Sequence, residues 1–362
     1  MTATAILPDN RPRTTTTIID PTSDERWSRF IEGNKDAGVF HTAAWARVIE
    51  EAYHYVPRYY AAVDSSGVIH AAVPLWHIKS RLTGNRLVCL PFSDTCSPLG
   101  DEQDIIALLD TVKEDITGGR ASHLEIRGLP AAVVPDLTGL VARPYFSLYI
   151  VNLKPGPKQL MRDFHNNVRR SIRQAEGRDV TVRLSREKAD LDAYYALHVQ
   201  TRKKLGVLPQ PRSFFDSLYR NVIEQGLGYT GLAESDGRCI AGVVFLRHGT
   251  TLYYKFNASD EAYLRKRPNH LITWRAIEEA CAEGFQYLDL GRCAPEEESL
   301  RTYKTRWGAE EIELPYYYFP AVQGISSQSE SSGKYKAMQL FSRLAPMFAF
   351  KAAGSLLYRH LA

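Results

Sequence analysis

An internal repeat constrains the fold of this chain more than any other feature of its sequence. Residues 64–75 read DSSGVIHAAVPL and residues 234–245 read ESDGRCIAGVVF, so an acid, a glycine, an alanine and apolar positions recur at the same spacing. Strand-like runs precede both segments, at residues 59–63 and 229–233. Each copy therefore predicts a β-hairpin with a short polar turn that contains glycine.

The order of elements also repeats downstream of each hairpin. HLEI at residues 123–126 is similar to YLDL at residues 287–290, and both follow amphipathic helix patterns, at residues 104–116 and 271–283. Each half thus predicts a helix, a hairpin, a strand, a helix and a strand in turn. This order indicates an α/β (α+β) fold made of two similar domains.

The length of 362 residues and a hydrophobic content of 44% supply enough core for two domains. We expect a disordered leader over residues 1–17, an N-terminal domain over 18–154, a C-terminal domain over 155–323, and a linker with amphipathic helices over 324–362. The leader is polar and has no apolar stretch typical of a signal peptide, so we expect a cytoplasmic protein. The sequence leaves the oligomeric state open.

Charge and cysteine usage argue against several classes of function. Lys and Arg number 45 against 41 Asp and Glu, so the net charge is only +4 and we expect local basic patches and no DNA partner. The five cysteines form no C-x-x-C pair, and the ten histidines show neither H-x-x-x-H nor H-E-x-x-H spacing. We therefore expect no metal site.

Two segments are strongly basic. In residues 155–178 apolar side chains recur every four positions from Leu160 to Ile172, which predicts one amphipathic helix with a basic outer face. That face is either solvated or turned toward phosphates. Residues 334–362 carry five cations and no acid, and Pro346 should kink or split their helix. The apolar side of this segment either packs on the protein or lies on anionic lipid, as a peripheral contact at the inner face of the membrane.

Several short motifs follow one another in a characteristic order. They are FHTAAW (40–45), HYVP (54–57), HNNVRRSIRQA (165–175), HVQTRKKLG (198–206), YYKFNASD (253–260), PNH (268–270), LDLGR (288–292) and YKTRWG (303–308). Together with the repeat, they resemble the FemAB-like acyltransferases, including BioF2-like acetyltransferases, over residues 18–320. That family consists of tandem GNAT (N-acetyltransferase) domains. The resemblance therefore implies two GNAT-like domains, each with a mixed, mostly antiparallel sheet flanked by helices.

The resemblance also implies the activity, which is N-acyl or aminoacyl transfer to an amine of a cell-envelope or exopolysaccharide precursor. The best-known members add amino acids to the peptide stem of peptidoglycan precursors. The donor would be acyl-CoA or aminoacyl-tRNA, acting as a co-substrate, and we expect no tightly bound cofactor. Residues 296–300 read EEESL where relatives commonly have an Asn-x-Gly-Leu-like element. This departure weakens the carry-over of substrate from the best-known members to this chain.

Acyl transfer to an amine needs a fixed hydrogen-bond donor for the developing oxyanion and a group that accepts the amine proton. We expect Lys304, which matches the late lysine of the family, to hold the oxyanion or a donor phosphate. We expect Asp289 either to orient the amine or act as base, or to cap the following turn. The sequence has no G-x-S-x-G elbow, and an activated donor requires no covalent nucleophile.

Further substrate-binding candidates lie in the family motifs. A guanidinium can clamp phosphate in a bidentate manner, which suggests a pyrophosphate contact at residues 202–203. Residues 265–270 read RKRPNH, where ordinary acetyltransferases have a glycine-rich loop that cradles CoA, so the sequence does not support a tight CoA cradle. The candidates are Arg202, Lys203, Lys255, Arg267, Asn269, His270 and Trp307.

Three alternatives remain open at this stage. The first is an acetyl-CoA- or acyl-CoA-dependent N-acetyltransferase that acts on an amino sugar. The second is a non-catalytic tandem-GNAT scaffold, which gains if Lys304 and Asp289 do not line one cleft. The third is a tRNA-binding module, which requires a continuous basic surface from Arg169 to Arg267.

Overall fold

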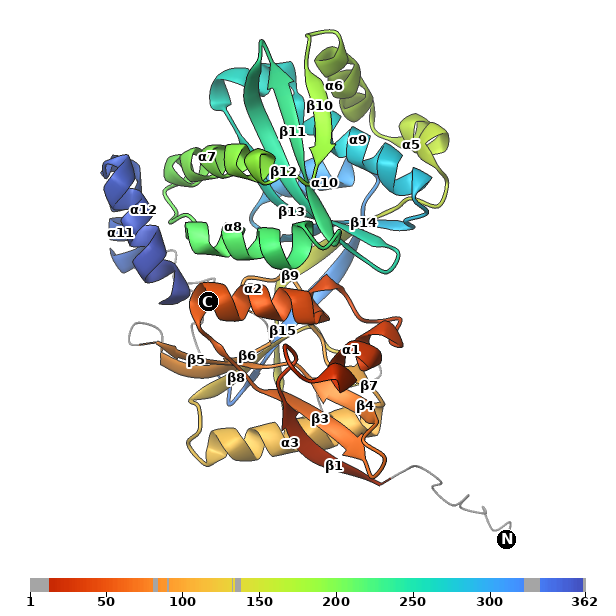
Figure 1. Ribbon diagram of the computed structural model, residues 1–362, viewed down its shortest axis with the longest axis vertical. Coiled ribbons are helices and arrows are strands. Elements are labelled where there is room, and N and C mark those ends of the chain that lie inside the picture. Colours follow the sequence, from red (N-terminus) through yellow and green to blue (C-terminus); the bar gives the residue numbers. More distant parts are fainter. Residues whose placement is uncertain are drawn as a thin grey trace.

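A computed structural model describes residues 13–80, 84–89, 91–131, 133, 138–321 and 333–360, without the side chains of residues 144, 145 and 333–337. In this part of the chain an 11-stranded sheet with the order β10-β11-β12-β13-β14-β9-β15-β8-β6-β5-β2 runs through the molecule, and a four-stranded sheet has the order β1-β3-β4-β7. Helices cover the faces of both sheets (Figure 1).

The first half has the following elements: β1 (Thr14–Ile19), α1 (Glu25–Glu32), the 3-10 helix η1 (Val39–His41), α2 (Ala43–Tyr53), β2 (Val56–Pro57), β3 (Tyr59–Asp64), β4 (Ile69–Val73), β5 (Trp76–Ser80), β6 (Gly84–Val88), β7 (Leu99–Gly100), α3 (Glu102–Thr117), β8 (His123–Arg127) and β9 (Val141–Asn152).

The second half has the following elements: α5 (Pro157–Asp163), α6 (Asn166–Glu176), β10 (Thr181–Ser185), α7 (Lys188–Leu205), α8 (Arg212–Leu218), the π-helical turn η2 (Tyr219–Ile223), β11 (Gly228–Ser235), β12 (Arg238–His248), β13 (Thr251–Ser259), the 3-10 helix η3 (Glu261–Lys266), α9 (Pro268–Ala282), β14 (Tyr287–Cys293), α10 (Glu298–Thr305) and β15 (Glu310–Phe319). The chain then continues with α11 (Gly333–Leu344), α12 (Met347–Leu357) and η5 (Tyr358–His360).

Both predicted hairpins are present, and each turn contains a glycine with a positive φ angle. β3 pairs with β4 through a turn at Gly67, and β11 pairs with β12 through a turn at Gly237. The leader is shorter than expected, because residues 14–17 belong to β1, which pairs with β3. Threonines and isoleucines make this segment a good edge strand. Residues 1–12 lie outside the described part.

The basic junction segment forms two helices, so the prediction of one helix over 155–178 is wrong. The chain leaves helical geometry at Phe164, and the side chain of His165 accepts a hydrogen bond from the backbone N–H of Asn167 to begin α6. The apolar residues still face one core, because Leu160, Phe164, Val168 and Ile172 are all buried. The expected linker at residues 324–332 lies outside the described residues.

The two halves share one sheet, so the boundary at residues 154/155 does not separate two independent sheets. β9 pairs with β14 and β15, and β15 in turn pairs with β8 of the first half. In Figure 1 these two long strands connect the upper and lower parts of the molecule. α2 and α8 pack across the junction, where the ring of Trp45 contacts that of Phe214. The core therefore continues from one half into the other.

Candidate active site

The candidate site lies where two parallel strands part. Residues Thr251–Tyr253 of β13 pair with Tyr287–Asp289 of β14, and beyond these residues the two strands diverge. A pocket of about 380 Å³ occupies the space between their diverging ends. Its lining residues come from β13, β14, α9, α10 and a loop of the first half: Asp94, Tyr254, Lys255, Asn257, Asn269, Leu290, Gly291, Arg292, Leu300, Tyr303 and Lys304.

A buried ion pair joins the two halves at this pocket. In the β12–β13 ladder Val244 pairs with Phe256 and Phe245 with Tyr254, so Lys255 is the extra residue of a β-bulge. Its Nζ lies 2.7 Å from Oδ2 of Asp94, which comes from the first half. Burial alone raises the pKa of Asp94, but the neighbouring cations Lys255 and Arg292 outweigh it and lower that pKa below its usual value. Asp94 is thus held as a carboxylate.

Lys304 points into the same pocket from α10 and is only 4% exposed. Its Nζ donates hydrogen bonds to the backbone carbonyl oxygens of Gly291 at 2.9 Å and Arg292 at 2.7 Å. Burial lowers the pKa of Lys304, while the carboxylate of Asp94 opposes this change. An ammonium group has three N–H donors, so these two bonds fix its position and leave a third donor for a ligand.

Asp289 lies behind this wall of the pocket. It is buried, and its Oδ1 accepts a hydrogen bond of 2.6 Å from the backbone N–H of Gly291. Burial, followed by the charge of Asp94, raises the pKa of Asp289 to about 7. Gly291 has a φ of 76°, and a Cβ added there would lie 3.3 Å from Oδ2 of Asp94. The glycine therefore keeps the floor of the pocket open.

Comparison with known proteins agrees with this geometry. Residues 162–305 match the family model of the GNAT acetyltransferase domain, and this segment includes all pocket residues except Asp94. FemX has a similar structure over 84% of this chain and 97% of its own, with a TM-score of 0.68 and 16% identity. Residues 162–305 thus form a GNAT-type acyltransferase domain, and the chain as a whole has the fold of tandem GNAT proteins.

Two further solved structures share the tandem fold at low sequence identity. L-PGS from Bacillus licheniformis is 12% identical, with 90% of this chain and 98% of that chain covered and a TM-score of 0.57. A tandem GNAT protein from the clavulanic acid biosynthesis pathway is 11% identical, with 86% and 99% covered and a TM-score of 0.53. No curated protein matches this acyltransferase in sequence.

The structure brings some of the predicted site residues together. Lys304, Lys255 and Asn269 line the pocket, and the side chain of Asn269 is hydrogen-bonded to that of Ser259. Asp289 does not line it, although it lies directly behind Gly291. The condition that would favour the scaffold alternative is therefore met, and the match to a GNAT acetyltransferase domain is what argues against that alternative.

His270 and Trp307 stand behind the pocket instead of in it. Trp307 is fully buried, and its ring contacts those of Phe164 and His270. Burial, with the nearby Arg267, lowers the pKa of His270 to about 4. These two aromatic side chains support the position of α10. Arg267 is exposed at the N-terminus of α9 and does not line the pocket.

Arg202 and Lys203 are placed elsewhere, which argues against the predicted pyrophosphate contact. Lys203 donates to the backbone oxygens of Ser342 and Ala345 at the end of α11. Arg202 donates to the backbone oxygen of Leu208 and to the hydroxyl of Tyr358. Both cations therefore anchor the C-terminal helices to α7.

Sequence reasoning missed several pocket residues. Asp94 gave no signal, because it lies in a loop of the first half, far from the other pocket residues in the chain. Arg292 and Tyr303 stand inside the LDLGR and YKTRWG motifs, so the motifs themselves were the available signal. The Arg292 guanidinium lies 4.0 Å from the centre of the Phe146 ring and 3.7 Å from Asp94.

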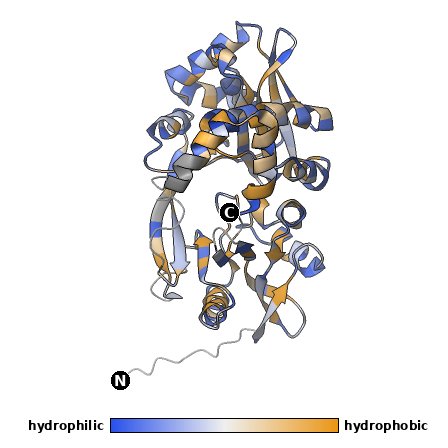
Figure 2. Cartoon of the chain, turned by 90° about the vertical axis from the view of Figure 1, so that its left-hand side faces the viewer, coloured by the Kyte–Doolittle hydropathy of each residue, from blue (hydrophilic) through white to orange (hydrophobic). Residues whose placement is uncertain are grey.

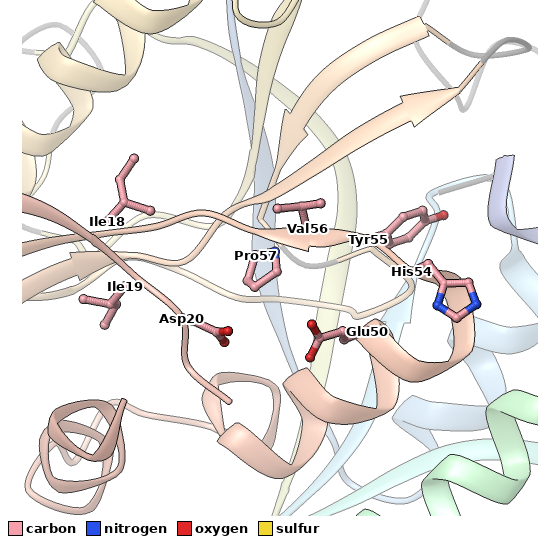
Figure 3. Close-up of a pocket in the computed structure, with 8 residues that line it drawn as sticks. All are labelled: Ile18, Ile19, Asp20, Glu50, His54, Tyr55, Val56 and Pro57. Atoms are coloured by element: carbon pink, nitrogen blue, oxygen red, sulfur yellow. The ribbon is translucent and has the colours of Figure 1, made fainter. Parts of the chain in front are cut away.

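A second depression, of about 450 Å³, lies in the first half between β1, α2 and β2. Figure 3 shows the carboxylates of Asp20 and Glu50 on one side of it and the apolar side chains of Ile18 and Val56 beside them. Among the described residues, no lysine or arginine lines this depression. That lining therefore offers no ammonium or guanidinium donor for an oxyanion.

No group of three or more His, Cys, Asp or Glu side chains that could hold a metal ion occurs among the described residues. Within that same part of the chain, every helix is too short or too polar to cross a membrane.

Proposed function

We propose that this acyltransferase moves an acyl or aminoacyl group onto an amine of a cell-envelope or exopolysaccharide precursor. One observation carries the proposal: Lys304, held by two strand carbonyls, shares a pocket with the Asp94–Lys255 ion pair at the point where β13 and β14 part. A cation and a carboxylate in one small pocket meet the two electrostatic needs of amine acylation.

Lys304 is the group that meets the developing negative charge. As the amine attacks, the carbonyl oxygen of the acyl group becomes an oxyanion, and the third N–H of Lys304 is available to it. The two carbonyl contacts hold the ammonium in place before the substrate arrives, so little reorganisation is needed. Lys255 holds the Asp94 carboxylate in place through their ion pair.

Asp94 is the group that accepts the proton. The amine nitrogen forms a bond to the acyl carbon, and the bond from that carbon to the oxygen or sulfur of the donor breaks. One proton passes from nitrogen to the Asp94 carboxylate and from there to the leaving alkoxide or thiolate, so Asp94 is a carboxylate again at the end. Asp289 is a positioning residue in this scheme, because it shapes the Gly291 turn and its charge state changes the field at Asp94.

Aminoacyl-tRNA is the donor that the surface favours. The basic helix α6 lies against the turn before α9, where Arg178 donates a hydrogen bond of 2.5 Å to the backbone oxygen of Arg265. Arg170 and Arg173 of α6 and Arg267 before α9 are exposed, and α9 carries Asn269 of the pocket. A basic strip beside the pocket suits a polyanion. Acyl-CoA is the second candidate donor, because the matched domain is an acetyltransferase domain.

The test is a transfer assay with both donors, aminoacyl-tRNA and acetyl-CoA. The acceptors are a nucleotide-linked muramyl peptide and a glucosamine oligosaccharide. Lys304→Met should lower turnover by about 10²- to 10³-fold, the usual loss when an oxyanion donor is removed. The matched control is Lys158→Met, which removes an exposed lysine from α5. Equal turnover in the two variants would exclude the role proposed for Lys304.

The identity of the donor is tested by measuring the salt dependence of donor binding and by substituting exposed arginines of α6. Arg170→Gln with Arg173→Gln should weaken tRNA binding and reduce its salt dependence, while acetyl-CoA binding stays unchanged. A thermal shift with acetyl-CoA alone, and none with aminoacyl-tRNA, would identify the second candidate donor instead.

A further inference from the structure

The two C-terminal helices expose an unusual number of large apolar side chains. Leu344 is 73% exposed, Phe348 78% and Leu356 69%. Four more flank them: Leu340, Phe341, Met347 and Leu357. Figure 2 shows the side of the molecule that carries α11 and α12, and hydrophobic segments of these helices face the viewer. We call these seven side chains the C-terminal apolar face.

The opposite side of the same helices is firmly packed on the protein. In α12 and the turn after it, Phe350, Gly354 and Tyr358 are buried at four-residue spacing. A Cβ at Gly354 would lie 2.6 Å from the backbone oxygen of Pro209, so the helix lies directly against that loop. The hydroxyl of Tyr55 also donates to the backbone oxygen of Arg359. The helices therefore hold the apolar face outward and do not use it for their own attachment.

Cations concentrate around this face. Residues 331–362 contain five of the 45 cations and none of the 41 acids, which leaves 40 cations against 41 acids for the rest of the chain. The whole positive excess of the protein thus lies in this segment. Arg343 and Lys351, whose side chains the structure describes, are both exposed.

We propose that the C-terminal apolar face docks on an anionic phospholipid bilayer. Apolar side chains enter the boundary between headgroups and acyl chains, and the cations contact lipid phosphates. The inference goes beyond the acyl-transfer chemistry and does not depend on it. It places the enzyme on the surface where lipid-linked precursors are found.

A second copy of the chain is a poorer occupant of this face. In a two-fold dimer the same surface meets itself, so Arg343 and Lys351 would face a surface that carries the same cations. The segment has no acid with which to pair them. Like charges brought together at an interface are unfavourable. A bilayer that contains phosphatidylglycerol supplies both the apolar layer and the missing negative charge.

The test is flotation of the full-length chain with vesicles, scored without any activity assay. Vesicles of phosphatidylglycerol and phosphatidylcholine should bind the protein, and phosphatidylcholine alone should bind it much less. Phe348→Ser with Leu356→Ser should weaken binding on the order of tenfold or more, because two exposed side chains no longer enter the bilayer. The matched control is Val56→Ser with Val68→Ser, which removes two exposed apolar side chains from the first half.

The charge contribution has its own pair of variants. Arg343→Gln and Lys351→Gln should each weaken binding about fivefold at low salt, and raised salt should reduce the difference. Thermal unfolding of all these variants should stay near that of the wild type, since the changed side chains are exposed.

Three outcomes would overturn the proposal. One is equal vesicle binding by the Phe348/Leu356 variant and its control. Another is equal binding to vesicles with and without phosphatidylglycerol. The third is a concentration-dependent dimer, detected by sedimentation, that the Phe348/Leu356 variant abolishes, because this would identify a second copy as the occupant.

Discussion

The two halves of the molecule contain the same parallel strand pair, and the pocket of the candidate site lies at the pair of the second half. In the first half β6 runs parallel to β8, with Val88 opposite Glu125. In the second half β13 runs parallel to β14, with Tyr253 opposite Asp289. Each pair thus presents a buried carboxylate at the corresponding position.

Two residues further along the strand, the halves differ. The first half has Arg127, whose guanidinium pairs with Glu125 at 2.8 Å and donates to the backbone oxygen of Ser93. Burial lowers the pKa of Arg127, but Glu125 outweighs it and raises that pKa above its usual value. The second half has Gly291 at this position, and the space that an arginine side chain would fill belongs to the pocket.

The comparison shows how one half supports the other. Arg127 closes the first strand pair and holds the loop at Ser93, and the next residue in this loop is Asp94. Asp94 then enters the pocket of the second half and pairs with Lys255. The first half therefore supplies a fixed loop that completes the pocket of the second half.

The sharpest way to break the comparison is to give the second half the residue of the first. Gly291→Arg should lower acyl transfer at least about 10³-fold, because the side chain fills the pocket and displaces the contacts of Lys304. Gly237→Arg is the matched control: its φ of 71° is close to the 76° of Gly291, but nothing lies within 4 Å of an added Cβ. Both should show similar backbone strain, and only Gly291→Arg should be inactive in the transfer assay. If Gly291→Arg had the turnover of the wild type, the pocket could not be the site of acyl transfer.

The next effect concerns the closed strand pair. Arg127→Met leaves the Glu125 carboxylate buried without its partner and should cost roughly 3–5 kcal/mol in the free energy of unfolding, measured with urea. Arg275→Met breaks an exposed ion pair with Glu176 and should cost about 1 kcal/mol or less.

A second variant separates charge from packing. Glu125→Gln with Arg127→Met removes both charges and should recover much of the lost stability. If Arg127→Met alone proves as stable as the wild type, the guanidinium does not hold the first half closed. Lower acyl transfer by a variant that remains folded would show that the loop at Asp94 depends on Arg127.

The third effect is a change in pH dependence. The pKa of Asp289 is about 7 in the folded chain against 3.8 ordinarily, so the folded state binds the proton more tightly. The contribution of this group to the free energy of unfolding therefore falls as pH rises from about 4 to about 7. In Asp289→Asn this fall should be absent, so the melting temperature of the variant should rise relative to the wild type over that range. Parallel pH profiles of the two melting temperatures would count against a raised pKa.

The repeat made much of the fold predictable from the sequence. Both hairpins, the helices at α3 and α9 and the strands β8 and β14 occur where the pattern places them, because local spacing of apolar residues and turn glycines determines such elements. The division at Pro346 into α11 and α12 was predictable for the same reason. The break at Phe164 was not, because its side chain keeps the four-residue spacing of one continuous helix.

The site was predictable only in part. Lys304, Lys255 and Asn269 stand in motifs near the strands and helices that form the pocket, so order along the chain was a useful guide. Arg202 and Lys203 stand in an equally basic motif, yet they anchor the C-terminal helices. The sequence alone does not distinguish a lysine or arginine that binds substrate from one that donates hydrogen bonds to the end of a helix.

The sequence by itself determined the duplicated pattern of strands and helices and the basic, acid-free C-terminal segment. Both are properties of neighbouring residues, which local spacing and composition encode directly. Only the tertiary structure decided that β9 and β15 join the halves into one sheet, that Asp94 enters the pocket of the other half, and that Arg127 closes the first strand pair where Gly291 leaves the second open. These contacts join residues far apart in the chain, and their geometry depends on how the two halves pack.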